Sequence, residues 1–270
     1  MTAVGGIIGD IIGSIYEFRN IKTKKFELFG VGCDYTDDTI LTVATAKWLL
    51  ETGGHGDSWK LYFRYGFNFP NPVGGYGTHF KQWVERAAEG DFSPYGSCGN
   101  GSAMRVGPVG WAFNTEAEVL KYAKLSAEST HNHPEGIKGA QAVALAILWA
   151  RQGVDKDTIA KKLGEITDYE LYYTCDEIRD SYTWGGLCQN TVPQAIMAFL
   201  DGSDFEDCIR NAISLGGDSD TLACITGSIA EAYYGIPQDI YDKALGYLPE
   251  TFCNTIQEFE NLHGSYILKQ

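Results

Sequence analysis

The stretch "SLGGDSDTLACITGSIAEAYYG", residues 214–235, places acidic side chains where a buried helix is expected to begin. Asp218, Asp220 and Thr221 follow two glycines and precede a run of apolar and very small residues. One carboxylate at a helix start is common, because it accepts hydrogen bonds from free N–H groups and the helix dipole favours negative charge. Two carboxylates ~5 Å apart repel by about 3 kcal/mol at an effective dielectric constant of ~20, so solvent or a cation must neutralise them. Taken alone, this stretch leaves both alternatives open.

A second segment repeats this combination. In "CDYTDDTILTVATAKWLL", residues 33–50, the cluster Thr36, Asp37, Asp38 and Thr39 again precedes an apolar stretch of helical character. Two distant helix starts with acids beside threonine favour one shared acidic site.

Composition limits the class of protein. The 270 residues are 44% hydrophobic, and no low-complexity linker divides them, so we expect a single domain over 1–270. The net charge of −14 makes nucleic acid an unlikely partner. The seven cysteines include no C-x-x-C pair and indicate reduced thiols. Without a signal peptide or a membrane-length apolar run, the sequence predicts a cytoplasmic protein.

Apolar spacing predicts helices throughout. Residues 135–153, "EGIKGAQAVALAILWARQG", follow a 3.6-residue period, and alternation typical of strands is absent. Ser203 and Glu206 have the spacing of a capping box. A further helix is predicted to bury one stripe: Phe252, Ile256, Phe259 and Leu262. We therefore predict an all-α fold, a bundle of helices.

Small residues at four-residue spacing predict two helices in close contact. Gly5, Gly9 and Gly13 form one such series, and Ala223 with Gly227 form another. On a helix this spacing gives a flat face that another backbone can approach. Tight packing of this kind fixes the acidic helix starts in space.

Three further segments are candidates for the same site. Asp10 and Glu17 are seven residues apart and hence on one face of the first helix, so Glu17 could point into the same cavity. Residues 66–79 and 90–108 are predicted loops rich in Gly, Asn and Ser, whose N–H groups could bind a diphosphate. Neither loop has the spacing of a known phosphate-binding motif.

The order of six motifs resembles that of the ADP-ribosylglycohydrolase family. They are "GGIIGDIIGSIYEF", "YTDDT", "GGYG", "GSCGNGSAMR", "SAESTHNHPEG" and "GGDSDT", and they extend from about residue 5 to 235. The resemblance implies a compact all-α domain, a centre of two Mg²⁺ or Mn²⁺ ions, and hydrolysis of ADP-ribose from a modified protein side chain. It implies ADP-ribose and an ADP-ribosylated protein as partners of a monomer.

The same motifs assign site residues by resemblance. The metal ligands implied are Thr36, Asp37, Asp38, Asp218, Asp220 and Thr221. The residues implied around ADP-ribose are Ser97, Cys98, Gly99, Asn100, Gly101 and His131, with Tyr76 and Gly77 near the diphosphate. Glu17 and Asp37 are the candidate general bases. The oxygen-only ligand set independently favours Mg²⁺, Mn²⁺ or Ca²⁺ over zinc.

Two residues depart from the family pattern. Glu231 replaces a usual glycine, but it lies ten residues beyond Thr221, ~15 Å along the helix, so it bears on packing and not on the metals. Cys98 stands where some relatives have an aromatic residue, which weakens stacking on the ligand.

Several alternatives remain open from sequence. An EF-hand is disfavoured because "DSDTLACITGSI" has neither the central glycine nor the closing glutamate, and "HNH" at 131–133 lacks partners for a zinc site. The protein could bind ADP-ribose without cleaving it, or cleave another conjugate such as O-acetyl-ADP-ribose. His131 could be a core histidine. Arg19, Lys22, Lys24 and Lys25 follow Glu17, and a basic rim there favours a serine over an arginine acceptor, although screened lysines pointing to solvent would give no preference.

Overall fold

The computed structural model describes residues 3–264, so positions 1–2 and 265–270 of the predicted domain lie outside it. Within that range the chain forms fifteen helices and no strand, apart from one isolated bridge between Gly99 and Leu187. The all-α prediction is confirmed. None of the helices in the described range is long and apolar enough to span a membrane. The helices are α1 (Gly5–Gly13), α2 (Asp37–Thr52), α3 (Ser58–Asn68), α4 (Thr78–Ala88), α5 (Gly101–Met104), α6 (Gly107–Ala112), α7 (Glu116–Glu128), α8 (Pro134–Arg151), α9 (Lys156–Thr167), α10 (Cys175–Ile178), α11 (Cys188–Asp201), α12 (Phe205–Ser214), α13 (Ser219–Tyr234), α14 (Gln238–Leu245) and α15 (Glu250–His263).

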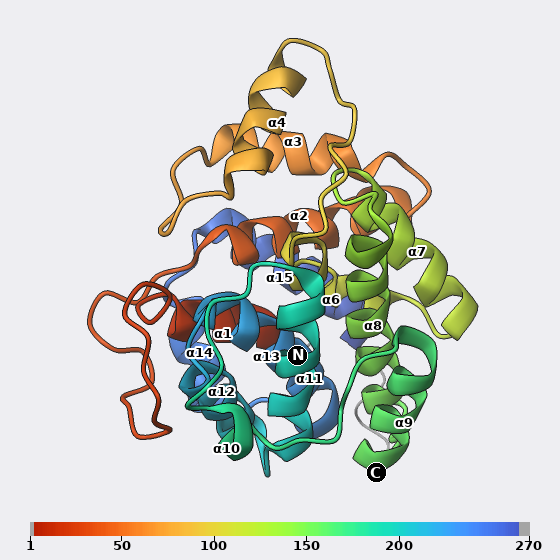
Figure 1. Cartoon of the computed structure of the whole chain (residues 1–270). Coiled ribbons are helices and arrows are strands. Elements are labelled where there is room, and N and C mark those ends of the chain that lie inside the picture. The colour runs from red at the N-terminus through yellow and green to blue at the C-terminus, as the bar shows by residue number, and fades with distance from the viewer. Residues whose placement is uncertain (1–2, 265–270) are drawn as a thin grey trace.

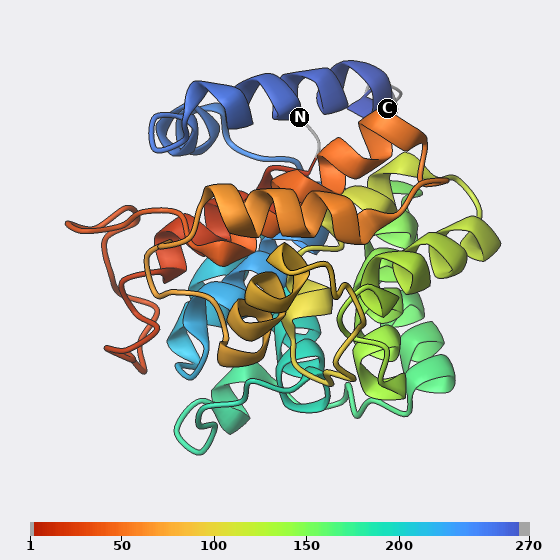
Figure 2. The same ribbon diagram turned by 90° about the horizontal axis from the view of Figure 1, so that it is seen from above.

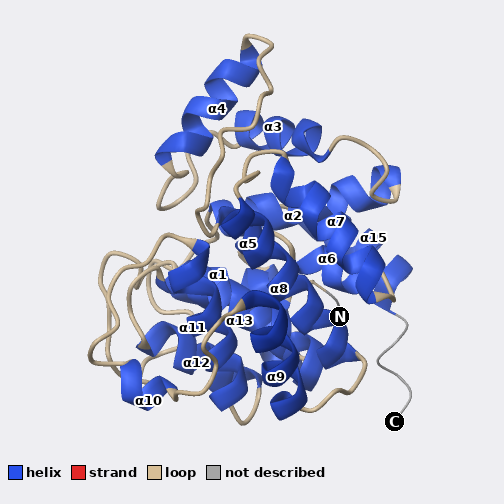
Figure 3. Ribbon diagram, turned by 45° about the vertical axis from the view of Figure 1, so that its right-hand side comes forward, coloured by secondary structure: helices blue, strands red, loops and turns tan. Residues whose placement is uncertain are grey.

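Helix α13 is the central element of the bundle. It packs against α1, α8, α11 and α12, and its residues are buried from Ser219 to Ala232 (Figure 1). Helix α2 packs on α1, with α3 on one flank and α15 on another, and α15 lies along the outside of the molecule when seen from above (Figure 2). Helices α3 and α4 extend beyond this body at one end (Figure 3). The first turns of α2 and α13 therefore both lie against α1.

The predicted close contact between glycine faces is confirmed at the crossing of α1 and α13. A Cβ atom added to Gly5 would lie 2.2 Å from the carbonyl oxygen of Gly227, and one added to Gly9 would lie 2.0 Å from that of Ala223. At Gly13 the added atom would lie 2.6 Å from the Cα of Asp220. The two backbones touch without intervening side chains, which fixes Asp220 relative to α1.

Glu231 links α13 to α1 by hydrogen bonds at the other end of the crossing of these two helices. Its side chain is fully buried, and Oε2 accepts hydrogen bonds from the backbone N–H groups of Val4 at 3.0 Å and Gly5 at 2.8 Å. These N–H groups lie at the start of α1 and have no partner within the helix. A residue on α13 therefore caps α1, which explains why a glutamate is accommodated here.

Four local predictions differ from the structure. Helix α1 ends at Gly13, so Glu17 lies in the turn beyond it and not on the helix face with Asp10. Helix α12 is capped by Asp204, which accepts from Asp207 N at 2.8 Å, so the capping box predicted from Ser203 and Glu206 is wrong. Leu262 is 62% exposed, although the rest of its predicted stripe is buried. The predicted loop 90–108 includes α5 and the start of α6.

Candidate metal centre and adjoining cavity

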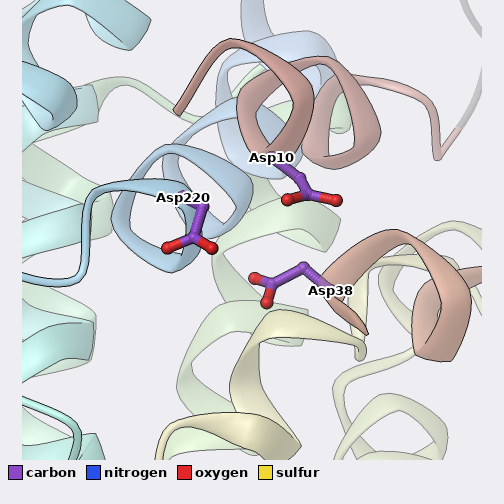
Figure 4. Close-up of side chains that lie close together, drawn as sticks. All are labelled: Asp10, Asp38 and Asp220. Carbon is purple, nitrogen blue, oxygen red and sulfur yellow. The ribbon is translucent and has the colours of Figure 1, made fainter. Parts of the chain in front are cut away.

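The two acidic helix starts meet in space, as predicted. Asp10 on α1, Asp38 on α2 and Asp220 on α13 direct their carboxylates toward one another (Figure 4), with one oxygen of each within 4.8 Å of the others. A second group at the same spacing contains Glu17, Asp218 and Asp220. Asp220 belongs to both groups, so the two lie next to each other.

Asp10 holds the start of α2 in place. Its carboxylate accepts hydrogen bonds from the backbone N–H groups of Thr36 at 2.9 Å and Thr39 at 3.1 Å, and from their hydroxyls at 2.7 and 2.5 Å. Burial raises the pKa of Asp10 to about 6, and these hydrogen bonds oppose the rise. Asp10 was not predicted as a site residue, although a single charge within the apolar run "GGIIGDIIG" is the signal that marks it.

The environment of the carboxylates suits a cation. Burial, reinforced by mutual repulsion, raises the pKa of Asp37, Asp38 and Asp220 well above the usual range. Burial and the charges of Asp218 and Asp10 raise the pKa of Glu17 to about 7. Asp38 Oδ1 is buried and has no hydrogen-bond partner within the described chain. An unpartnered buried oxygen among hard oxygen donors fits Mg²⁺ or Mn²⁺.

The α13 acids are not solvated caps. Asp218 is 8% exposed and makes no capping hydrogen bond with its side chain. Instead its Oδ2 accepts from Asn100 Nδ2 at 2.7 Å, and Thr221 Oγ1 donates to Asp38 Oδ2 at 3.3 Å. The solvent alternative raised by the sequence is therefore wrong for Asp218 and for Asp220, which is 4% exposed.

Thr36 and Asp37 lie at the edge of this arrangement. Thr36 caps α2 by accepting from Asp38 N at 3.2 Å, and its hydroxyl hydrogen is directed at Asp10. Asp37 is half-buried beside the cavity described next. Neither belongs to the two close carboxylate groups. Their roles as metal ligands stay predictions.

A cavity of about 560 Å³ opens next to the acidic cluster. One end is lined by Glu17, Asp37, Asp38, Asp218, Asp220 and Thr221. Every residue predicted around ADP-ribose lines the rest of it: Ser97, Cys98, Gly99, Asn100, Gly101 and His131. Gly77 also lines the cavity, whereas Tyr76 does not, and its hydroxyl donates to the Phe69 carbonyl at 2.9 Å. A larger hollow of about 710 Å³, lined by Tyr169, Tyr182 and Gln194, contains neither acidic group.

The 97–101 loop is held by hydrogen bonds within the protein. Gly99 N donates to Ser97 Oγ at 3.0 Å and Asn100 N donates to the Gly186 carbonyl at 3.0 Å. Cys188 N donates to the Cys98 carbonyl, also at 3.0 Å. Because the N–H groups of Gly99 and Asn100 are already used, this loop does not offer the open row of donors expected from its composition.

The basic rim expected after Glu17 is absent from the cavity. Lys22 Nζ donates to the Tyr182 and Leu215 carbonyls at 2.6 and 2.5 Å, and Lys24 pairs with Asp207 at 2.5 Å. None of the four basic residues Arg19, Lys22, Lys24 and Lys25 lines the cavity. The expectation that they face the ligand is therefore wrong, because Lys22 and Lys24 bond to other parts of the protein.

Aromatic side chains take the place of lysines at the mouth of the cavity. Phe18 is stacked on Trp184, with ring centroids 6.0 Å apart, and Trp184 lines the cavity. Both rings are exposed, at 71% and 51%. Phe18, directly after Glu17, and Trp184, far along the chain, therefore form an aromatic rim.

Comparison with known proteins identifies the group to which this arrangement belongs. The family model described as ADP-ribosylglycohydrolase matches residues 2–266. The chain belongs to the ADP-ribosylglycohydrolase family. It is 29% identical to ADP-ribosylhydrolase ARH3 of Mus musculus over 95% of this chain and 86% of that protein. It is 24% identical to ADP-ribosylarginine hydrolase Tri1 of Pseudomonas putida, over 86% and 69% respectively.

A solved structure supports the same assignment. The protein described as an ADP-ribosylglycohydrolase-related protein complex has a TM-score of 0.74 and 25% identity, covering 97% of this chain and 96% of that one. Family membership supports removal of ADP-ribose by hydrolysis.

Asn20 is a residue beside the site that sequence reasoning missed. Its Nδ2 lies 2.8, 2.9 and 2.8 Å from the carbonyl oxygens of Tyr16, Glu17 and Gly217, so its two hydrogens are shared among three acceptors. Gly217 N donates to its Oδ1 at 2.8 Å. One amide therefore joins the Glu17 turn to the turn that precedes Asp218. No spacing rule marks it, because the contact joins residues 197 positions apart.

Proposed function

We propose that this protein uses two divalent cations, Mg²⁺ or Mn²⁺, to hydrolyse the bond between ADP-ribose and a protein side chain. The observation that carries the proposal is the pair of adjacent carboxylate groups sharing Asp220 at the end of a cavity of about 560 Å³. Two groups of hard oxygen donors suit two cations, and a cavity of this size suits a nucleotide-sized ligand.

The proposed mechanism assigns the acids to two tasks. Asp38, Asp218 and Asp220 hold the cations with Thr36, Asp37 and Thr221, and the cations, when bound, supply positive charge that orients the ribose hydroxyls and acidifies a water molecule. A carboxylate of the chain accepts a proton from the attacking water, whose oxygen forms a bond to the anomeric carbon. The bond from that carbon to the acceptor side chain breaks, and the acceptor leaves with the proton that the carboxylate took from the water.

Glu17 and Asp37 are the two candidates for the general base. Both line the cavity, and a pKa of about 7 suits Glu17 to exchange a proton near neutral pH. Glu17→Gln and Asp37→Asn, assayed at saturating magnesium, separate them. The base is the residue whose amide variant loses at least about a hundredfold in turnover while retaining magnesium-dependent stabilisation. Undiminished turnover removes a residue from the role.

The acceptor is a serine or an arginine side chain. The basic rim that favoured serine does not face the cavity, whereas the Phe18 and Trp184 rings beside Glu17 suit a guanidinium group. The decisive assay supplies serine-linked and arginine-linked ADP-ribosyl peptides of matched sequence, and O-acetyl-ADP-ribose, at equal concentration with magnesium. Release of free ADP-ribose is measured by chromatography, with Asp220→Asn as the inactive control.

The results of this assay distinguish the three candidate functions: hydrolysis of a protein linkage, hydrolysis of O-acetyl-ADP-ribose, and binding without hydrolysis. Faster release from either peptide supports the proposal and identifies the acceptor. Release from O-acetyl-ADP-ribose alone replaces the substrate with that conjugate. Binding of ADP-ribose without release from any of the three makes the protein a binding module and overturns the proposal.

A further inference from the structure

The histidine that lines the cavity has its two ring nitrogens in different surroundings. His131 is 5% exposed, and its Nδ1 lies 2.8 Å from Thr130 Oγ1. Its Nε2 faces the 99–101 loop, 3.0 Å from the position that a Cβ atom on Gly101 would occupy. Nε2 is therefore the nitrogen directed at the cavity.

A buried arginine lies behind this histidine. Arg105 is fully buried, and its Nη2 donates hydrogen bonds to the Ser126 carbonyl at 3.0 Å and to Thr130 Oγ1 at 2.9 Å. The guanidinium carbon lies 3.8 Å from the centre of the Tyr62 ring. Its Nε and Nη1 have no hydrogen-bond partner within residues 3–264, and Arg105 also lines the cavity.

Hydrogen-bond chemistry then determines where the proton of His131 lies. A guanidinium group can only donate, so Thr130 Oγ1 must accept from Arg105. A hydroxyl has one hydrogen. Arg105 Nη2 cannot accept it, whereas His131 Nδ1, 2.8 Å away, can. Donation from a cation also polarises the Thr130 hydroxyl and strengthens it as a donor. Nδ1 is therefore an acceptor.

The ring is also neutral. Burial, and then the positive charge of Arg105, lower the pKa of His131 well below its usual range. A neutral imidazole that accepts at Nδ1 carries its hydrogen on Nε2. That nitrogen has no lone pair left for a metal ion or a proton.

We infer that Arg105 and Thr130 are positioning residues that hold His131 as a neutral hydrogen-bond donor, with its Nε2–H directed at an oxygen of the bound ligand. This inference rests on the proposed function, in which that ligand is ADP-ribose. One wall of the cavity then carries hydrogen-bond donors and the positive charge of Arg105, and the other end carries carboxylates. The first suits negatively charged oxygens of a ligand, and the second suits cations.

The tautomer is tested on the unmodified protein without any ligand. Long-range ¹H–¹⁵N correlation spectra of labelled protein at neutral pH are recorded, with His131→Gln identifying the signals and exposed His55 as an internal comparison. We expect an unprotonated Nδ1 and a protonated Nε2 in a single form. A proton on Nδ1, an imidazolium, or a mixture of the two tautomers overturns the inference.

Variants test whether this arrangement serves binding. Thr130→Val removes the hydroxyl, Thr130→Ser retains it, and Thr226→Val removes another buried hydroxyl, which donates to the Ala195 carbonyl instead. Calorimetric titration of ADP-ribose should show affinity about 3- to 10-fold weaker for Thr130→Val, and within about twofold of the wild type for the other two. Equal affinity in all four proteins overturns the binding role.

Failure of the proposed function and failure of the inference about Arg105 and Thr130 give different results. If the unmodified protein does not bind ADP-ribose, the proposed function and the binding role fall together, and the spectrum alone decides the proton position. If it binds ADP-ribose but carries its proton on Nδ1, the proposed function stands and the inference about Arg105 and Thr130 is wrong.

Discussion

Replacing Glu231 with glutamine should change how stability depends on pH. Burial raises the pKa of Glu231 from its usual 4.5 to about 7, although the N–H groups of Val4 and Gly5 oppose the rise. The folded state therefore binds this proton more tightly than the unfolded state does. The contribution to stability is complete below about pH 4.5 and is lost as the pH rises through about 7.

The size of the effect follows from the same values. A rise from 4.5 to about 7 corresponds to about 3 kcal/mol in the free energy of unfolding, of which about 2 kcal/mol falls between pH 5.5 and 8.5. Glutamine keeps an oxygen to accept from both N–H groups but has no charge. The difference in stability between variant and wild type should therefore shift in favour of the variant by about 2 kcal/mol across this range.

Urea unfolding at pH 5.5, 6.5, 7.5 and 8.5 with saturating magnesium measures this difference, in which the contribution of the acidic cluster, common to both proteins, cancels. Glu165→Gln, which removes an exposed carboxylate from α9, is the matched control and should show no trend. A difference between Glu231→Gln and wild type that stays constant within about 0.5 kcal/mol would refute the reasoning.

Other outcomes follow from the site. Magnesium added to chelator-treated protein should stabilise it by about 2.7 kcal/mol at a hundred times the dissociation constant. In thermal melts this gain should be larger at pH 8 than at pH 5.5, because protons on carboxyls of raised pKa compete with the cation, and Asp220→Ala should abolish it. His131→Ala should weaken ADP-ribose binding in calorimetry and leave magnesium affinity unchanged; loss of the metal would reverse its assignment. Asn20→Ala should cost about 1–3 kcal/mol in urea unfolding and lower turnover through misplacement of Glu17, whereas Asn261→Ala, on the exposed side of α15, should do neither.

The sequence predicted what repeats locally and missed what depends on distant contacts. The glycine spacing predicted the crossing of α1 and α13, and paired acids with threonine predicted that two helix starts share a site. Glu17 was expected on the same helix face as Asp10 because seven residues make two turns, but the chain leaves the helix at Gly13. The lysines after Glu17 were assigned to the rim by their position in the sequence, whereas their partners lie on α12 and near residue 215.

Two roles could be found only in three dimensions. Asp10 stands out in the sequence as a charge in an apolar run, yet its four hydrogen bonds come from Thr36 and Thr39, at the start of the helix that begins at Asp37. Arg105 is part of a recognisable motif, but nothing in that motif shows that its guanidinium is fully buried against Thr130. Burial and partner identity arise from packing, which periodicity does not encode.

The contact of bare backbones between α1 and α13 also has a consequence for motion. With no side-chain layer between them to rearrange, the two helices cannot slide or separate by rotamer changes, so Asp10 and Asp220 move as parts of one body. Amide protons on both sides of the crossing, at Gly9 and Ala223, should exchange with deuterium only through global opening, at matching rates. Glu17, in the turn beyond Gly13, lies outside this rigid crossing.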